Sequence, residues 1–428
     1  MADIKPLRAW RYNEKLSKNI EALTSPLFDV VSEAHREALY SNPYNSIHLS
    51  VPQTSAPAGH AHDLLKAWKK QGIIVQDTKP AIYVYYQYYT PPGASSETCR
   101  KGFICNIRIY DWNEGVIQRH ENTIPKSVND RIELLEKTQL NVSATHGLYT
   151  DNEFVLEEFM DDAIKNPLYE TEDYQGVRDV LAVITNETVI QKFVSVLKDK
   201  KVILADGHHR YEGSLLYKKQ QEKSNPNHTD SRGYNFHLMY LTNTETGGYR
   251  ILPTHRLIKN LEMFDEKNFL QKLSEDFIVK RVDDMGALPE IIAGKRWTFG
   301  VLLKNSAYKV QLKSESFPQL KWNFPTVVKQ LDLTVLHYFI IEKIMNIPGR
   351  DQRQSSNIEF DRNFSNCLSI VIQKKAQVAI ITNEISIEEV KSVCESGYTM
   401  PQKSTYFYPK VICGLLFGSI KENEFELS

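Results

Sequence analysis

The stretch ADGHHRYEG, residues 205–213, follows the apolar run VIL and precedes SLLYKKQQ. KVILA has the length and apolar character of a short buried strand, and HRYEGSLLYKK carries apolar residues near helical spacing. DGH therefore lies where a strand turns into a helix. Because the first backbone N–H groups of a helix have no partner within the helix, such a turn attracts anions.

The residues of this turn suit phosphate chemistry. Gly207 would let the backbone come close to a ligand, and Arg210 could form paired hydrogen bonds with phosphate oxygens. Asp206 could hold a cation or a hydroxyl, or it could simply cap the helix. His208 and His209 are a poor chelating pair, because neighbouring side chains on a helix point about 100° apart. On the sequence alone, an anion site and simple capping both stay open.

Composition limits the class of protein. The chain has 428 residues, which favours two domains, and its 52 Lys and Arg against 53 Asp and Glu give a formal net charge of -1. Nothing in this balance indicates nucleic acid or a membrane as a partner. The 5 cysteines include no CxxC pair, so they are interpreted as reduced thiols. With no apolar leader and no window long enough to span a membrane, the expected location is the cytoplasm.

The pattern along the chain predicts a mixed α/β fold. Residues 81–90 and 102–112 are predicted to be paired strands, and a helix is expected to begin with Ser127 as its N-cap. Further strands and helices alternate after them, with helices near 266–275 and 326–346, a hairpin between these helices, and a capped helix that Gly397 ends. The predicted domains are residues 1–260 and 261–428.

Three further motifs carry charge or hydroxyl groups. RHENTIPKSVNDR, residues 119–131, is either a solvated surface or a phosphate cradle, and a carboxylate among its cations could act as a base. MPQKSTYFYPK, residues 400–410, has no periodicity and is either a functional loop or an edge strand. ILPTHRLI, residues 251–258, places a histidine and an arginine after a strand. His337 lies in an apolar stretch and is interpreted as a core residue.

The chain lacks GxxxxGK[ST], GxGxxG, HExxH and GxSxG, which disfavours the standard nucleotide folds and common hydrolases. At RHENT, ADGHHRYE, LPTHRL and MPQKSTYFYPK, in this order along the chain, it resembles a bacterial family known as a domain of unknown function, DUF1015. The resemblance spans essentially the whole chain. Through its DGHHR turn the family is similar to a ParB/sulfiredoxin-like group that includes free-serine kinases, some of them dependent on pyrophosphate.

The resemblance implies a ParB/sulfiredoxin-like catalytic core with insertions, followed by a C-terminal α/β domain whose 400–410 loop completes the site. It implies phosphoryl transfer from pyrophosphate to free L-serine. For this chemistry we expect Mg²⁺ as cofactor, bridging pyrophosphate oxygens, with Asp206 as its ligand. The implied catalytic residues are Glu121, Asp206 and His208. The implied substrate-binding residues are His120, Thr123, Lys126, Arg131, Gly207, His209, Arg210, His255, Arg256, Lys403, Ser404, Thr405 and Lys410.

Physical chemistry is consistent with this reaction. A serine hydroxyl is a poor nucleophile at neutral pH and benefits from a positioned carboxylate, while the charged transition state needs cations and N–H donors. Two alternatives remain, a kinase that uses ATP or ADP and a ParB-like regulator that binds a nucleotide or DNA. The near-zero net charge counts against DNA. The sequence does not decide between Glu121 and Asp206 as the base, and a homodimer stays open.

Overall fold

The structure is a computed structural model that describes residues 1–27, 33–173, 175–401 and 403–425. The chain forms two compact units: unit 1 comprises Met1–Tyr249 and Pro409–Ser428, and unit 2 comprises Arg250–Tyr408. These bounds differ from the predicted division near residue 260, because the chain leaves unit 1 earlier and its last segment returns there. Strand β13 (Arg250–Ile251), at the start of unit 2, pairs with β20 (Phe407–Tyr408) at its end.

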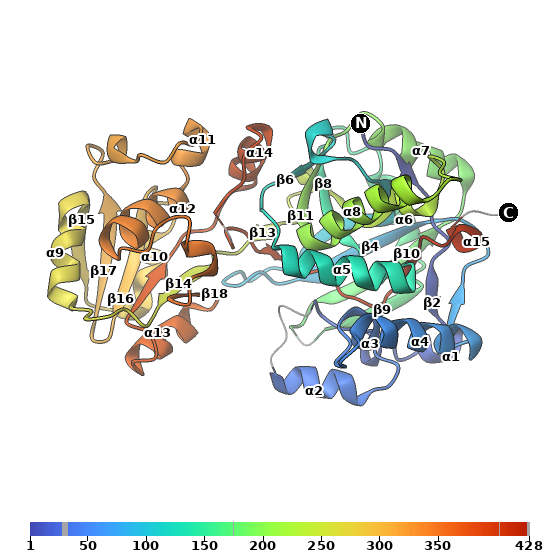
Figure 1. The fold of residues 1–428 in the computed structure, drawn as a ribbon, viewed down its shortest axis with the longest axis horizontal. Coiled ribbons are helices and arrows are strands. Elements are labelled where there is room, and N and C mark those ends of the chain that lie inside the picture. The colour runs from blue at the N-terminus through green and yellow to red at the C-terminus, as the bar shows by residue number, and fades with distance from the viewer. Residues whose placement is uncertain (28–32, 174, 402, 426–428) are drawn as a thin grey trace. The chain divides into compact units, whose positions relative to one another are not determined.

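Unit 1 is built around a mixed sheet with the order β6-β11-β8-β12-β5-β4-β10-β9, with β1 paired to β5 (Figure 1). The predicted pairing of residues 81–90 with 102–112 is confirmed by the antiparallel pair of β4 and β5. The mixed α/β class is also confirmed. The strands are β1 (Ile4–Lys5), β4 (Ile82–Tyr89), β5 (Thr98–Arg108), β6 (Ile117–Arg119), β8 (Thr145–Tyr149), β9 (Tyr169–Glu172), β10 (Arg178–Ile184), β11 (Val202–Asp206) and β12 (Phe236–Asn243).

Helices cover both faces of this sheet, because the central strands are apolar on both sides. On β4, Tyr83 and Tyr85 pack with the cluster that contains Trp68 of α4, whereas Val84 and Tyr86 pack with Phe193 of α7. Short strands β2 (Trp10–Tyr12) with β3 (Ile74–Gln76), and β7 (Leu140–Asn141) with β21 (Gly418–Ser419), form separate ribbons. The helices are α1 (Glu14–Ser17), α2 (Glu33–Ser41), α3 (Ile47–Ser50), α4 (Pro57–Lys70), α5 (Pro125–Thr138), α6 (Glu157–Ala163), α7 (Glu187–Leu197), α8 (His208–Ser224) and α15 (Glu422–Phe425).

Helix α5 begins earlier than its sequence indicates. Pro125 is at its first position and Ile124 is the N-cap residue, which offers no side-chain cap. The prediction that Ser127 caps this helix is therefore wrong, and the proline, which has no N–H to satisfy and a backbone angle suited to a first turn, decides the start.

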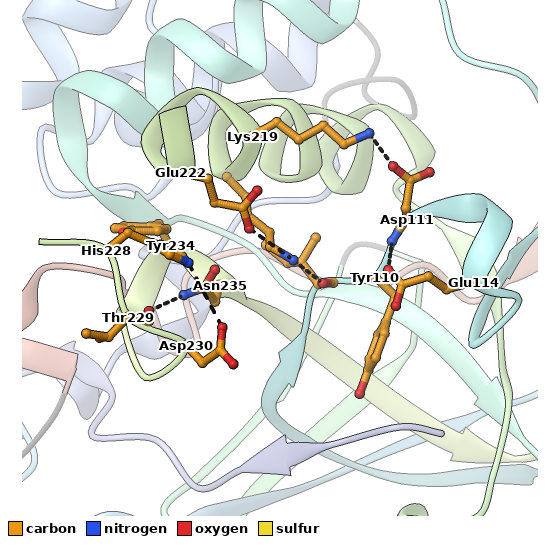
Figure 2. Close-up of polar contacts among 12 residues, drawn as sticks. Tyr110, Asp111, Glu114, Lys219, Glu222, His228, Thr229, Asp230, Tyr234 and Asn235 are labelled. Atoms are coloured by element: carbon orange, nitrogen blue, oxygen red, sulfur yellow. Dashed lines mark hydrogen bonds and ion pairs between the residues drawn. The ribbon is translucent and has the colours of Figure 1, made fainter. Parts of the chain in front are cut away.

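Helix α8 is fixed along its second half by contacts to the loop after β5. Figure 2 shows Lys219 paired with Asp111, whose own backbone N–H donates to Glu114 Oε1 at 2.6 Å. Lys218 Nζ donates to the Ile109 carbonyl at 2.9 Å. These contacts hold the axis of α8, so the position of its N-terminus is determined by the body of unit 1.

Unit 2 has an antiparallel sheet in the order β15-β17-β16-β19-β14-β18, with an apolar cluster on each face. The predicted hairpin is confirmed by β16 with β17, and the capped helix by α14, where Ser386 and Glu389 form a capping box. The elements are β14 (His255–Ile258), β15 (Phe277–Val282), β16 (Thr298–Leu303), β17 (Ser306–Leu312), β18 (Ile358–Asp361), β19 (Val378–Ile381), α9 (Glu266–Asp276), α10 (Leu288–Ile292), α11 (Thr326–Lys329), α12 (Asp332–Val335), the π-helical segment η8 (Leu336–Ile344), α13 (Phe364–Ile372) and α14 (Ile387–Glu395).

The helix expected over 326–346 is interrupted. Leu331 has an extended backbone between α11 and α12, and the carboxylate of the next residue, Asp332, accepts a hydrogen bond from the Trp297 N–H at 2.7 Å. Within the described ranges, no helix has both the length and the apolar character needed to cross a membrane.

Candidate active site

Two parallel strands bring the first two motifs together. Strand β6 pairs with β11 in parallel, with Arg119 opposite Leu204. Glu121 follows Arg119 by two residues and Asp206 follows Leu204 by two, so both carboxylates belong to the same carboxyl edge of the sheet. Ligands of α/β proteins commonly bind beyond this edge of parallel strands.

Gly207 forms the turn between β11 and α8. Its φ of 92° lies in the left-handed region, and a Cβ there would come within 2.5 Å of Thr145 Cγ2. Both facts require glycine. Gly207 is itself the N-cap residue and provides no side-chain cap, so the interpretation of Asp206 as the N-cap is wrong. The N-terminus of this 17-residue helix thus keeps the N–H groups and partial positive charge that suit an anion.

Asp206 lies between two cations. Arg210 Nη2 donates to Asp206 Oδ2 at 2.8 Å, and Lys410 Nζ donates to Oδ1. Burial would raise the pKa of Asp206, but the charges of Lys410 and Arg210 outweigh it and hold the pKa well below the usual range. The carboxylate is therefore ionised at neutral pH, and Lys410, at the end of the MPQKSTYFYPK motif, belongs to this site.

His120 and His208 form a buried pair beside the turn. Their rings meet edge to face, with centroids 4.7 Å apart. Burial lowers the pKa of His120 to about 4 and that of His208 well below its ordinary value. Both imidazoles are therefore neutral at pH 7. His208 Nε2 is buried and has no hydrogen-bond partner among the described residues.

His209 holds the loop that carries Glu121. Its Nε2 accepts a hydrogen bond from the Ile124 N–H at 3.0 Å, which ties the residues between β6 and α5 to the first turn of α8. Glu121 and Thr123 in this loop are half-buried, while Lys126 in the first turn of α5 is exposed. The side chains of His208 and His209 thus make different contacts, as predicted from the different directions in which neighbouring residues on a helix point.

Two of the three arginines predicted to bind substrate, Arg131 and Arg210, belong to unit 1 and are hydrogen-bonded to the protein. Arg210 Nη1 donates to Ser143 Oγ at 2.9 Å and to the Ala144 carbonyl at 2.7 Å. Arg131 Nη1 donates to the Ser50 carbonyl at 3.0 Å. Arg210 therefore connects the turn to Ser143 and Ala144 through its bond to Asp206, whereas Arg131 is bonded to the end of α3. Direct binding of substrate by either arginine stays a prediction.

The remaining predicted residues, His255, Arg256, Lys403, Ser404 and Thr405, belong to unit 2. Arg256 is fully buried on β14, where burial lowers its pKa to about 9, and His255 Nδ1 accepts from the Thr382 N–H at 3.3 Å. Ser404 is buried and Lys403 exposed. Their contribution to a site with the DGHHR turn stays a prediction, as does completion of the site by the 400–410 loop.

Comparison with known families decides the assignment. The profile of the family described as "Protein of unknown function (DUF1015)" matches residues 4–334. The chain belongs to this family. A search of curated protein sequences found no match.

Solved structures similar to this DUF1015 chain include two complexes of one free serine kinase variant and one further protein. The first, in complex with AMP, is 11% identical, covers 76% of this chain and 93% of its own, and has a TM-score of 0.39. The second, in complex with ADP, is 11% identical, covers 76% and 94%, and has a TM-score of 0.38. A conserved hypothetical protein from Pyrococcus furiosus is 11% identical, covers 76% and 97%, and has a TM-score of 0.35. Likeness at this level assigns no chemistry to the DUF1015 chain.

A buried polar network that the sequence did not reveal supports Lys410. Gln87 Nε2 donates to the Lys410 carbonyl at 3.0 Å and to Asp179 Oδ1 at 2.8 Å, and Arg100 Nη2 donates to the Pro409 carbonyl at 2.5 Å. Burial raises the pKa of Asp179 to about 7. These residues lie on β4, β5 and β10. In the sequence they are only single polar residues within apolar strands, so the pattern does not indicate that they contact one another.

The described residues do not form a protein-only metal site. Across them, no group of three or more His, Cys, Asp or Glu side chains could hold a metal ion, and the Asp206 carboxylate already pairs with two cations. Mg²⁺ commonly binds through substrate phosphates with one or two carboxylates. Within the described residues there is therefore no ready-made cage of protein ligands, and binding of Mg²⁺ with Asp206 as a ligand stays a prediction.

Proposed function

We propose that this DUF1015 protein is a small-molecule kinase that transfers a phosphoryl group from inorganic pyrophosphate to free L-serine, giving O-phospho-L-serine and phosphate. The observation that carries the proposal is the turn from β11 into α8, where a helix N-terminus capped by Gly207 adjoins the Asp206–Lys410 pair. A helix N-terminus and a buried cation are the groups that stabilise a transferring phosphoryl group. We name L-serine as the acceptor because the DGHHR turn resembles the corresponding turn of free-serine kinases.

Glu121 is the proposed general base. It takes the proton from the serine hydroxyl as Oγ forms a bond to one phosphorus, and the bond from that phosphorus to the bridging oxygen breaks to release phosphate. Asp206, the rival, is held ionised by Lys410 and Arg210, and a carboxylate with a lowered pKa is a weak base. Asp206 instead orients Lys410 and Arg210 around the turn.

A nucleotide is the alternative donor, and Mg²⁺ is the proposed companion of either donor, held mainly by phosphate oxygens. Phosphorus NMR of the purified protein with pyrophosphate, ATP or ADP, each with L-serine and with or without Mg²⁺, separates these cases. We expect O-phosphoserine with pyrophosphate and Mg²⁺. If O-phosphoserine forms with ATP or ADP but not with pyrophosphate, the donor is a nucleotide and not pyrophosphate. If it forms with none of the donors, the kinase proposal is refuted.

The role of Glu121 has its own test. Glu121→Gln keeps size and hydrogen bonding but removes basicity, so kcat should fall roughly 10²- to 10⁴-fold while pyrophosphate binding changes little. Glu133→Gln, at an exposed position on α5, is the matched control and should retain full turnover. Near-full activity of Glu121→Gln would place the base elsewhere, with Asp206 as the next candidate.

A further inference from the structure

Three buried polar residues form a row across neighbouring strands of the unit 1 sheet. Gln87 of β4 lies opposite Asp179 of β10 on one side and opposite Arg100 of β5 on the other. Directly paired residues of antiparallel strands point to the same face of a sheet, so the three side chains lie side by side. Each is 0% exposed. Burial of such groups is costly unless they bond to one another or to the backbone.

The side-chain amide of Gln87 joins the other two members of the row. Arg100 Nη2 donates to Gln87 Oε1, and Gln87 Nε2 donates to Asp179 Oδ1 at 2.8 Å. A guanidinium group only donates, so the oxygen of the amide has to face Arg100. Asp179 Oδ1 also accepts from the Tyr85 hydroxyl, which identifies it as an acceptor for the N–H groups of the amide. The row therefore fixes the orientation of the Gln87 amide.

The same donors hold two consecutive carbonyl groups of the segment that returns to unit 1. Arg100 Nη2 donates to the Pro409 carbonyl at 2.5 Å, and Gln87 Nε2 donates to the Lys410 carbonyl at 3.0 Å. The next residue, Val411, packs into the apolar cluster on the same face of the sheet. The backbone of Lys410 is thus held from both sides.

A fixed backbone matters at Lys410 because its ammonium group belongs to the candidate site. The side chain is 12% exposed, and Nζ donates to Asp206 Oδ1. Asp206 directly precedes Gly207, the N-cap residue of α8. Lysine has a long and flexible stem, so the position of its ammonium group depends on where the backbone places the Cα atom. A shift of the two carbonyl groups would therefore move the ammonium group away from the helix N-terminus.

We infer that Gln87 and Arg100 are positioning residues for the proposed phosphoryl transfer. They hold the backbone of Lys410 so that its ammonium group stays beside Asp206, where it can contact the phosphate groups of the donor. Asp179 contributes by fixing the orientation of the Gln87 amide. The role of this alignment in catalysis rests on the proposed function, whereas the alignment itself belongs to unit 1 and is measurable without turnover.

The change Gln87→Met removes the bonds of the amide and keeps the length of the side chain. In the O-phosphoserine assay, the KM for pyrophosphate should rise about 10- to 100-fold, the loss expected for one misplaced charged contact. The KM for L-serine should change less than about 2-fold. Leu197→Ala, in the apolar cluster on the opposite face of the sheet, is the control for stability and should change neither KM. A loss of folded protein alone would lower only the apparent kcat.

A second pair of variants tests the orientation of the amide. Asp179→Asn keeps an oxygen that accepts from Gln87 Nε2, so the KM for pyrophosphate should stay near that of the wild type. Asp179→Leu removes this acceptor and should raise the KM as Gln87→Met does. If Gln87→Met fails to fold, Gln87→Glu takes its place, because it keeps the acceptor for Arg100 and loses the donors to Asp179 and Lys410.

Crystal structures of the full chain, wild type and Gln87 variant, give a readout that does not depend on activity. We expect Lys410 Nζ to contact Asp206 in the wild type and to be displaced from it in the variant. The same position of Lys410 in both structures would overturn the inference, as would an unchanged KM for pyrophosphate in an active variant. If the wild type forms no O-phosphoserine, the proposed function fails, and the two structures still decide whether the row positions Lys410.

Discussion

Gly207 illustrates how much one residue decides at the candidate site. Its positive φ and its contact with Thr145 are separate requirements. Gly207→Ala should therefore destabilise unit 1 through both backbone strain and a clash, by about 2–4 kcal/mol in total. Thr145→Ser removes the Cγ2 atom that an alanine Cβ would meet. In a double-mutant cycle by urea unfolding, adding Thr145→Ser should recover part of the clash, because the contacts with Arg210 Nη2 and Thr145 Cβ remain.

Additive effects of the two changes would contradict this steric interpretation, because residues in direct contact are expected to couple. Full recovery in the double variant would show that the backbone angle costs nothing. Either result would be visible in the urea midpoint without any assay of activity.

At the same scale, the sequence predicted the residue types of the site better than their partners. The strand-to-helix turn, the need for Gly207 and the divergence of His208 from His209 follow from local pattern. The Asp206–Lys410 pair does not, because its members are 204 residues apart. The inward direction of Arg210 also depends on Ser143 and Ala144, which no local pattern connects to it.

At the scale of elements, the last segment of the chain is part of unit 1. The backbones of Trp10 and Phe417 exchange hydrogen bonds of 3.0 and 2.9 Å, and the Phe417 ring lies edge-on to Tyr12, with centroids 6.0 Å apart. The segment carries Lys410 to the turn. Pairing between strands that are far apart in the chain leaves no signal in the sequence. The pattern therefore predicted two consecutive domains, 1–260 and 261–428, and not the return of the last segment to unit 1.

Phe417 is fully buried, so its removal should leave a cavity in the core of unit 1. We expect Phe417→Ala to lower the free energy of unfolding of unit 1 by about 3–5 kcal/mol. Lys421→Ala, exposed in the same segment, is the control and should change it by less than about 0.5 kcal/mol. Urea unfolding followed by tryptophan fluorescence measures both. Equal stabilities of the two variants would mean that the segment does not anchor the unit.

Helices with an amphipathic pattern and strands rich in β-branched and aromatic residues were predictable because their signals are local. The start of α5 was missed although Pro125 is itself a local signal for a first helical turn. The break before α12 had no local signal, because it depends on the bond from Trp297 to Asp332. Element type thus followed from the sequence, whereas boundaries and connections depended on tertiary contacts.

At the scale of the whole molecule, many histidines are buried in the neutral form. Burial lowers the pKa of each in the folded chain, to about 3 for His237 and His337, to about 4 for His120 and His255, and well below the ordinary value for His146 and His208. The folded state therefore takes up fewer protons than the unfolded state once the pH falls below about 6.5. The contribution of these histidines to the free energy of unfolding is therefore complete above that pH and decreases as the pH falls.

Two buried carboxyls act in the opposite direction. Burial raises the pKa of Asp179 to about 7 and that of Asp332 to about 6, so each favours the folded state as the pH falls from there toward 3.8. The six histidines outnumber them, and each histidine contributes about 1.4 kcal/mol per pH unit. The net effect between pH 6.5 and pH 5 is therefore destabilisation in acid.

Both units should therefore become easier to unfold as the pH falls below 6.5, because each contains histidines that are neutral when folded. Urea midpoints measured at pH 7.5, 6.5, 5.5 and 5.0 should fall steeply below 6.5. Asp179→Asn, which mimics the neutral acid, should remove one opposing group and steepen the fall, while His337→Gln should remove one titrating histidine and make it shallower. A midpoint that stays constant to pH 5 would mean that these histidines are protonated in the folded chain, and their burial as neutral rings would then be wrong.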